Sequence, residues 1–135
     1  MSRNADAAAG KSRRILLVDD VAHVAEALQE MLAAIGYAAE IAPGGEEALG
    51  KYEPGKYDLV ITDYTMPRMN GAELTRAIRA RSPGQLILLM VSPAQAGTGK
   101  DAEKVRADYL LPKPFSVKEF QDALTAIFSK DRETV

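Results

Sequence analysis

The sequence contains no cysteine and no long hydrophobic run, and these two absences exclude several classes of protein. Without cysteine, neither a disulfide framework nor a thiolate metal site can form. The longest strictly apolar run, LILLMV, is far too short to span a bilayer. The N-terminus also lacks the apolar segment of a secretory signal. The cytoplasm is therefore the expected location.

An excess of charge of one sign is also missing. The formal net charge is −2 over 135 residues, which gives no reason to expect a nucleic-acid surface. Hydrophobic residues make up 47% and charged residues 27%, proportions that are ordinary for a globular protein with its own core. We expect one domain over residues 13–130, preceded by a flexible tail at 1–12 and followed by a frayed end at 131–135.

Apolar runs alternate with amphipathic segments along the chain. The runs predict strands at about 14–19, 38–42, 58–62, 86–91 and 108–111. The segments between and after them predict helices at about 22–35, from PGGEE, from Asn70, near 101–105 and from Ser116. Five strands that alternate with five helices imply a parallel sheet that is covered on both faces.

Three local signals set the expected ends and faces of the helices. Asn70 with Glu73, and Ser116 with Glu119, have the spacing of capping boxes at helix starts. Gly36 is in the usual position after a helix end. In the first helix, apolar residues at helical spacing predict the buried face as Val24, Leu28, Met31 and Ile35.

Four of the predicted strands end at a polar side chain. Asp19 and Asp20 follow the first, Asp63 ends the third, Ser92 follows the fourth and Lys113 follows the last. The carboxyl ends of parallel strands lie along one edge of a sheet, where ligands bind. We therefore expect three carboxylates, a hydroxyl and an ammonium to converge, a set that can hold a divalent metal and a phosphoryl group.

The segments VDD, DLVITDYTMPRMNG, VS and LPKPF, in this order, resemble a response-regulator receiver domain from about residue 14 to 128. A DD pair alone is weak evidence, whereas MPRMNG after the third strand and a later KPF are specific. The resemblance implies a flavodoxin-like (βα)5 fold, a doubly wound parallel five-stranded sheet of order 2-1-3-4-5. It also implies that Asp63 is the phosphoacceptor of a two-component phosphorelay. Its implied Mg²⁺ ligands are Asp20, Asp63, the backbone carbonyl of Thr65, and Asp19 through water.

Elementary electrostatics supports these roles. Two carboxylates about 4 Å apart repel by roughly 4 kcal/mol at an effective dielectric near 20, so a cation must offset the cluster or a carboxylate must protonate. With oxygen ligands alone, Mg²⁺ is the natural candidate. A carboxylate is a competent nucleophile towards phosphorus. Lys113 would supply a positive charge and Ser92 a hydroxyl donor to the transferring group.

The resemblance implies the partners as well. The donor would be the phosphohistidine of a sensor histidine kinase or a phosphotransfer protein. Few residues follow the last predicted helix, so we expect signalling by contact with an unknown downstream protein, or onward transfer, without direct DNA binding or membrane insertion. We expect no enzymatic turnover beyond self-phosphorylation and autodephosphorylation.

Two other functions remain open at this level. A small Mg²⁺-dependent aspartyl phosphohydrolase would use the same carboxylates, although no second acid follows Asp63 two residues on and no cap domain is apparent. A degenerate receiver would serve only as an interaction module, which the complete acidic set argues against.

The sequence departs from the receiver pattern at two positions. Pro93 follows Ser92, where the family usually offers a backbone amide to the phosphoryl group, and proline has no N–H. Leu110 occupies the place of the family's switch aromatic. The neighbouring Tyr109 is expected on the opposite face of its strand, so it cannot replace that aromatic.

Further expectations concern the backbone and the remaining candidate side chains. The resemblance predicts a cis Lys113–Pro114 bond. Gly97 and Gly99 predict a loosely ordered segment after the fourth strand. The lone histidine, His23, is expected on the surface, and Met66 and Met69 are expected to pack within a turn.

Overall fold

The computed structural model describes residues 13–93 and 106–133, with side chains as far as residue 129. In chain order the elements are β1 (Arg14–Val18), α1 (Ala22–Ala34), β2 (Ala38–Ala42), α2 (Gly45–Lys51), β3 (Leu59–Asp63), α3 (Gly71–Arg81), β4 (Ile87–Val91), β5 (Tyr109–Pro112) and α6 (Val117–Glu133). The short helix predicted near 101–105 and the loosely ordered segment predicted around Gly97 and Gly99 lie outside the described residues.

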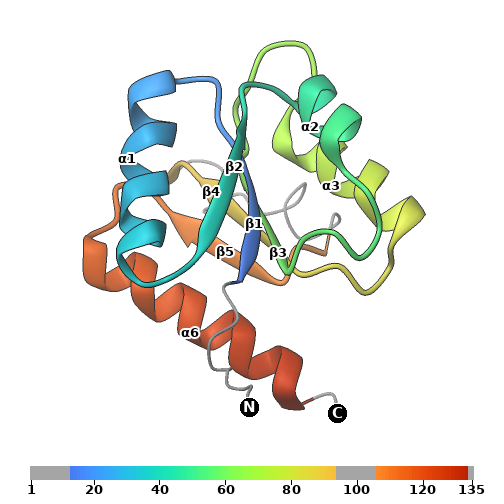
Figure 1. Ribbon diagram of the computed structural model, residues 1–135. Helices are drawn as coiled ribbons and strands as arrows, with labels where there is room; N and C mark the ends of the chain where they lie inside the picture. Colours follow the sequence, from blue (N-terminus) through green and yellow to red (C-terminus); the bar gives the residue numbers. More distant parts are fainter. Residues whose placement is uncertain (1–12, 94–105, 134–135) are drawn as a thin grey trace.

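The five strands form one parallel sheet in the order β2-β1-β3-β4-β5, which confirms the predicted topology. Among the described residues, α1 and α6 cover one face of this sheet, and α2 and α3 cover the other (Figure 1). β1 and β2 run upward in Figure 1, so the carboxyl ends of the strands lie towards the top. No helix in residues 13–93 or 106–133 has the length and apolar character needed to cross a membrane.

Alternation along the central strands divides the core between the two faces. Ile15 and Leu17 of β1 pack with Leu28 of α1 and Phe120 of α6. Leu16 and its neighbours on the same side of the sheet pack with α2 and α3. β1, β3 and β4 are therefore buried on both faces, which explains why their sequences are continuous apolar runs.

The predicted buried face of α1 is confirmed at Leu28 and partly at Met31, which packs against the core, but it is wrong at Val24 and Ile35. Val24 and Ile35 remain 36% and 40% exposed, whereas Ala25, Leu28 and Leu32 are buried. Both sets have helical spacing, so the pattern of apolar residues alone leaves the rotation of the helix undecided. Packing on the sheet selects the set that begins with a small alanine.

The predicted helix starts are confirmed by their hydrogen bonds. At α3, the N–H of Glu73 donates to Asn70 Oδ1 at 2.8 Å, and the N–H of Asn70 donates to Glu73 Oε1 at 2.9 Å. Ser116 and Glu119 make the same reciprocal pair at α6, at 3.0 and 2.8 Å. Gly36 follows the C-terminal end of α1 and has φ +90°, a backbone conformation that residues with a side chain rarely adopt.

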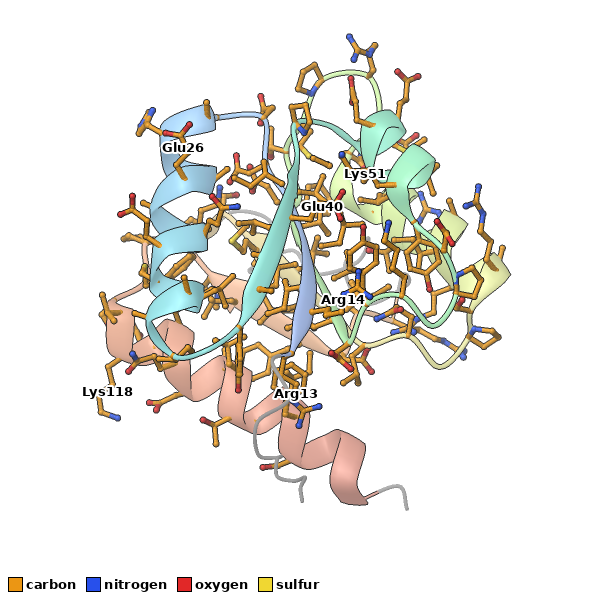
Figure 2. All side chains as sticks on the ribbon, viewed as in Figure 1. Arg13, Arg14, Glu26, Glu40, Lys51 and Lys118 are labelled. Carbon is orange, nitrogen blue, oxygen red and sulfur yellow. The ribbon has the colours of Figure 1, made fainter. Side chains whose placement is uncertain are left out.

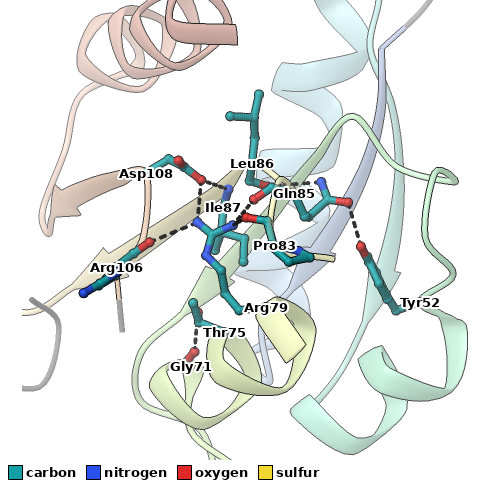
Figure 3. Close-up of polar contacts among 10 residues, drawn as sticks. All are labelled: Tyr52, Gly71, Thr75, Arg79, Pro83, Gln85, Leu86, Ile87, Arg106 and Asp108. Atoms are coloured by element: carbon teal, nitrogen blue, oxygen red, sulfur yellow. Dashed lines mark hydrogen bonds and ion pairs between the residues drawn. The ribbon is translucent and has the colours of Figure 1, made fainter. Parts of the chain in front are cut away.

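Arg79 of α3 joins the amino-terminal ends of β4 and β5 (Figure 3). Its guanidinium donates to the carbonyl of Pro83 at 3.0 Å and to that of Arg106 at 2.9 Å. It also pairs with Asp108 Oδ2 at 2.8 Å, which in turn accepts the N–H of Ile87. Asp108 lies just before β5, so the pair anchors the strand whose far end carries Lys113.

Edge strand β2 is tied to α2 by the pair Glu40 and Lys51, labelled in Figure 2. Lys51 Nζ lies 3.2 Å from Glu40 Oε2, and the hydroxyl of Tyr57 donates to Glu40 Oε1 at 2.8 Å. Burial, with this hydrogen bond, raises the pKa of Tyr57 to about 12, and the bond lowers the pKa of Glu40. This side of the sheet is thereby held by polar contacts as well as by apolar packing.

Candidate functional site

The three predicted carboxylates meet at the carboxyl edge of the sheet. Asp19 and Asp20 follow β1, and Asp63 ends the adjacent β3, with Val18 opposite Thr62 in the register. One oxygen of each carboxylate lies within 4.8 Å of the others. Parallel pairing therefore brings together residues that are more than forty positions apart in the chain.

Burial makes this negative charge costly. Asp19 and Asp63 are 3% and 5% exposed, while Asp20 is exposed. Burial raises the pKa of Asp19, and the negative charge of the nearby Asp63 raises it further. The N–H of Val21, which donates to Asp19 Oδ1 at 3.0 Å, lowers this pKa but does not cancel the rise. A bound cation would offset the repulsion within this set.

Lys113 reaches the cluster from β5, as predicted. Its Nζ lies 2.7 Å from Asp63 Oδ1, and its side chain remains 40% exposed. The N–H of Lys113 donates to the carbonyl of Val91 at 2.7 Å, which fixes the backbone beside β4. The Lys113–Pro114 bond is cis, as predicted.

Asp63 Oδ1 retains capacity to bind a ligand. This atom is buried, and no described residue donates a hydrogen bond to it. Its contact with Lys113 Nζ, at 2.7 Å, is an ion pair. A buried carboxylate oxygen beside two other carboxylates, one of which, Asp20, is open to solvent, fits a hard cation that keeps several waters, such as Mg²⁺.

Ser92 and Thr65 lie on the same edge of the sheet. Asp63 is opposite Met90 in the β3–β4 register, and Ser92 follows directly after β4 as a half-buried residue. Thr65 is an exposed residue of the connection between β3 and α3, two positions after Asp63. Thr65 thus lies in the connection that follows Asp63, and Ser92 lies after β4, the strand that pairs with β3.

The connection from β3 to α3, residues 64–70, turns back sharply onto Asp63. The N–H of Gly71 donates to the carbonyl of Tyr64 at 2.8 Å. A Cβ at position 71 would overlap the Asp63 carbonyl oxygen and lie 2.7 Å from Leu89 Cδ1. Only glycine allows the start of α3 to lie this close to the candidate phosphoacceptor.

The two departures from the receiver pattern are visible in the structure. Pro93 is exposed directly after Ser92 at the candidate site. Leu110 is half-buried against a small cluster with Ala72 and Leu89, whereas Tyr109 packs on the opposite side of the sheet against the α1 and α6 core. The prediction that Tyr109 and Leu110 face opposite ways is confirmed.

The remaining candidate residues are placed as expected, but one contact was not foreseen. His23 is exposed on α1, and Met66 is buried at 7% exposure between β1 and α2 residues. Met69 also packs against that cluster and lies directly over Gly45 of α2. In the sequence, Gly44 and Gly45 indicate the start of a helix and do not by themselves indicate this contact.

Comparisons with known proteins agree with this geometry. Residues 15–125 match the model of the response regulator receiver domain. The chain is 36% identical over 120 residues to response regulator MprA of Mycolicibacterium vanbaalenii, covering 87% of this chain and 51% of that protein. It is 33% identical over 119 residues to transcriptional regulatory protein RprY of Bacteroides fragilis, covering 88% and 50%. The chain thus spans about half the length of these curated relatives.

A solved structure shows the same fold and a similar sequence. Response regulator protein TrrA of Thermotoga maritima, in complex with Mg²⁺-BeF, superposes with a TM-score of 0.77 at 34% identity, covering 85% of this chain and 98% of that one. Three observations indicate the same family. They are the order of the strands, the edge where three aspartates and a lysine meet, and the match over residues 15–125. The chain belongs to the response regulator receiver domain family.

Proposed function

We propose that this chain accepts a phosphoryl group on Asp63 from the phosphohistidine of a sensor histidine kinase or phosphotransfer protein, with Mg²⁺ as cofactor. The observation that carries the proposal is the meeting of three carboxylates with Lys113, whose Nζ lies 2.7 Å from Asp63 Oδ1. TrrA, which the chain resembles, has been solved in complex with Mg²⁺-BeF, and this supports the binding of a metal and a phosphoryl-like group by this chain.

In the proposed reaction, an oxygen of Asp63 forms a bond to phosphorus while the P–N bond to the donor imidazole breaks. The imidazole leaves with the bonding electrons and takes a proton. Lys113, already at Asp63, would stay with the developing negative charge on the phosphoryl oxygens, and the Ser92 hydroxyl would donate to one of them. Mg²⁺, when bound to Asp20, Asp63 and the Thr65 carbonyl, with Asp19 acting through water, supplies charge neutralisation.

The consequence of phosphorylation would lie in protein contacts. We propose that the domain acts in the cytoplasm and signals to an unknown downstream protein, by contact or by onward transfer, without itself binding DNA or inserting into a membrane. Its chemistry would be limited to its own phosphorylation and dephosphorylation. A phosphohydrolase would instead turn over phosphate monoesters such as p-nitrophenyl phosphate, and we expect no such turnover.

Labelling with a small phosphodonor tests the proposal and its dependence on metal. We expect acetyl phosphate with Mg²⁺ to add one phosphoryl group to the chain. Asp63 would be the nucleophile, and Lys113, with a metal ion at the acidic cluster, would neutralise the added negative charge. Removal of the metal with EDTA should abolish labelling. Intact-mass spectrometry measures both results. A chain that stays unlabelled while a control receiver is labelled would identify a degenerate interaction module.

Pro93 predicts that the phosphoryl group is held weakly, and Leu110 predicts that the structure near β5 changes little on phosphorylation. Pro93 has no N–H to donate, and a hydrogen bond to a charged group contributes about 1.5–3 kcal/mol. We expect Pro93→Ala to bind beryllofluoride roughly ten- to hundredfold more tightly than the wild type, by titration calorimetry.

A second substitution, at Leu110, tests the expected small structural change near β5. In a Pro93→Ala, Leu110→Tyr double variant, the new ring at position 110 can change rotamer, and we expect larger NMR shift changes near β5 on adding beryllofluoride. If the wild type already binds as tightly and shifts as much as the double variant, another element carries the signal.

A further inference from the structure

We infer that the first turn of α2 positions the β3–α3 connection, residues 64–70, and thereby sets the Mg²⁺ affinity of the acidic cluster. The residues responsible are Gly45, which Met69 covers, and Glu46 and Glu47, which pair with Arg68. In Figure 1 this connection arches over the top of the sheet beside α2. The inference rests on the proposed Mg²⁺ site and names residues outside its ligand set.

Backbone hydrogen bonds hold the two ends of the connection, and a further one lies within it. The N–H of Tyr64 donates to the carbonyl of Met90 at 2.9 Å, and the carbonyl of Tyr64 accepts the N–H of Gly71. Between these points lie Thr65, whose carbonyl is the proposed metal ligand, and the residues up to Met69. The N–H of Met69 donates to the carbonyl of Pro67 at 2.8 Å, so the position of Met69 is coupled to the residues that follow Thr65.

The closest packing is between Met69 and Gly45. A Cβ built on Gly45 would lie 2.8 Å from Met69 Cγ and Sδ and 2.9 Å from Met69 Cβ. Met69 Cβ is attached to the backbone, so a methyl group at position 45 must displace the connection itself and not just the end of a flexible side chain. A Cβ on the neighbouring Gly44 would meet the carboxylate end of Glu47, the group that pairs with Arg68, whereas a Cβ on Gly50 in the same helix would meet no atom within 4 Å.

Arg68 provides a second link between the same segments. Its backbone is in the left-handed region, at φ 70°. Its Nε lies 3.1 Å from Glu46 Oε1, and its Nη2 lies 3.5 Å from Glu47 Oε2. All three side chains are more than 40% exposed, so each ion pair is weak. The two pairs therefore add to the contact between Met69 and Gly45, which is the main link between α2 and the connection.

Mg²⁺ makes the site sensitive to small displacements of this connection. The ion requires nearly ideal octahedral geometry, unlike Ca²⁺. Met66, the neighbour of Thr65, and Met69 pack in the same core cluster. A group at position 45 that displaces Met69 therefore disturbs the packing of Met66 and, with it, the position of Thr65. The first turn of α2 is therefore expected to act on metal affinity more than on folding.

Paired glycine variants test the inference. We expect Gly45→Ala to weaken Mg²⁺ binding by about tenfold, the lower end of the loss that follows removal of an outer support of a metal site. Gly50→Ala is the matched control, because a Cβ there would meet no atom within 4 Å, and it should bind Mg²⁺ as the wild type does. Titration calorimetry with MgCl₂ gives both affinities, and urea unfolding without Mg²⁺ shows that both chains are folded. In a Met69→Ala background, Gly45→Ala should lose most of its effect.

The arginine link is tested at the surface, where substitution leaves the core intact. Arg68→Gln should weaken Mg²⁺ binding about threefold, as expected from the loss of exposed ion pairs, and Arg68→Lys should restore part of it. Arg76→Gln, on the exposed side of α3, is the control. If the wild type binds Mg²⁺ and both Gly45→Ala and Arg68→Gln match it, the inference is wrong. If the wild type binds no Mg²⁺, the metal site of the proposed function is wrong, and the inference with it.

Discussion

Replacing Asp63 by asparagine is expected to abolish phosphorylation of this chain by acetyl phosphate, to below about one hundredth of the wild-type rate, because the amide cannot serve as the nucleophile. The folded state should not suffer. Asp63 is buried beside Asp19 and Asp20, so removing its charge relieves repulsion and offsets the loss of the ion pair with Lys113. The rate of labelling is measured by intact mass, and stability by the urea midpoint.

A second carboxylate provides the control for this experiment. Asp58 is exposed just before β3, at the opposite end of the strand, where its Oδ2 accepts the N–H of Arg14 at 2.7 Å. Asp58→Asn should be labelled at the wild-type rate. Equal labelling of the Asp63→Asn protein would show that another residue receives the phosphoryl group and that the assignment of Asp63 is wrong.

Substituting Gly71 by alanine is expected to lower the free energy of unfolding by about 3 kcal/mol, the upper end of the usual cost of overpacking. The added Cβ would overlap the carbonyl oxygen of Asp63 and lie 2.9 Å from Tyr64 Cα. Both are backbone atoms at the end of a central strand, so neither can move without disturbing β3. Urea unfolding measures the loss, and slower phosphorylation is expected because Asp63 is displaced.

Gly50 provides the matched substitution. It lies inside α2, and a Cβ there would meet no atom within 4 Å. Gly50→Ala is therefore expected to stabilise the domain by up to about 1 kcal/mol through helix propensity. The opposite signs of the two alanine variants would separate steric contact from a general response to alanine. Wild-type stability in Gly71→Ala would show that the connection yields without cost.

The elements and the edge that carries the candidate site were predictable from neighbouring residues. Apolar runs gave the central strands, because strands buried on both faces have no polar side to alternate with. The helix starts at Asn70 and Ser116 were predictable from the sequence because a capping box involves residues only three positions apart. The convergence of Asp19, Asp63 and Lys113 followed from one further rule, that parallel strands end at a common edge.

Contacts between distant segments were not predictable in this way. The rotation of α1 towards Ala25 depends on the sheet beneath it, and two registers of the helix fit the same apolar pattern. The glycines at 45 and 71 have the same local signal as any turn glycine, yet each is required by atoms of another segment, Met69 in one case and Asp63 in the other. Steric fit between segments depends on three-dimensional separation, which spacing along the chain does not encode. The sequence therefore specified which groups form the site, and packing in space specified how closely they approach.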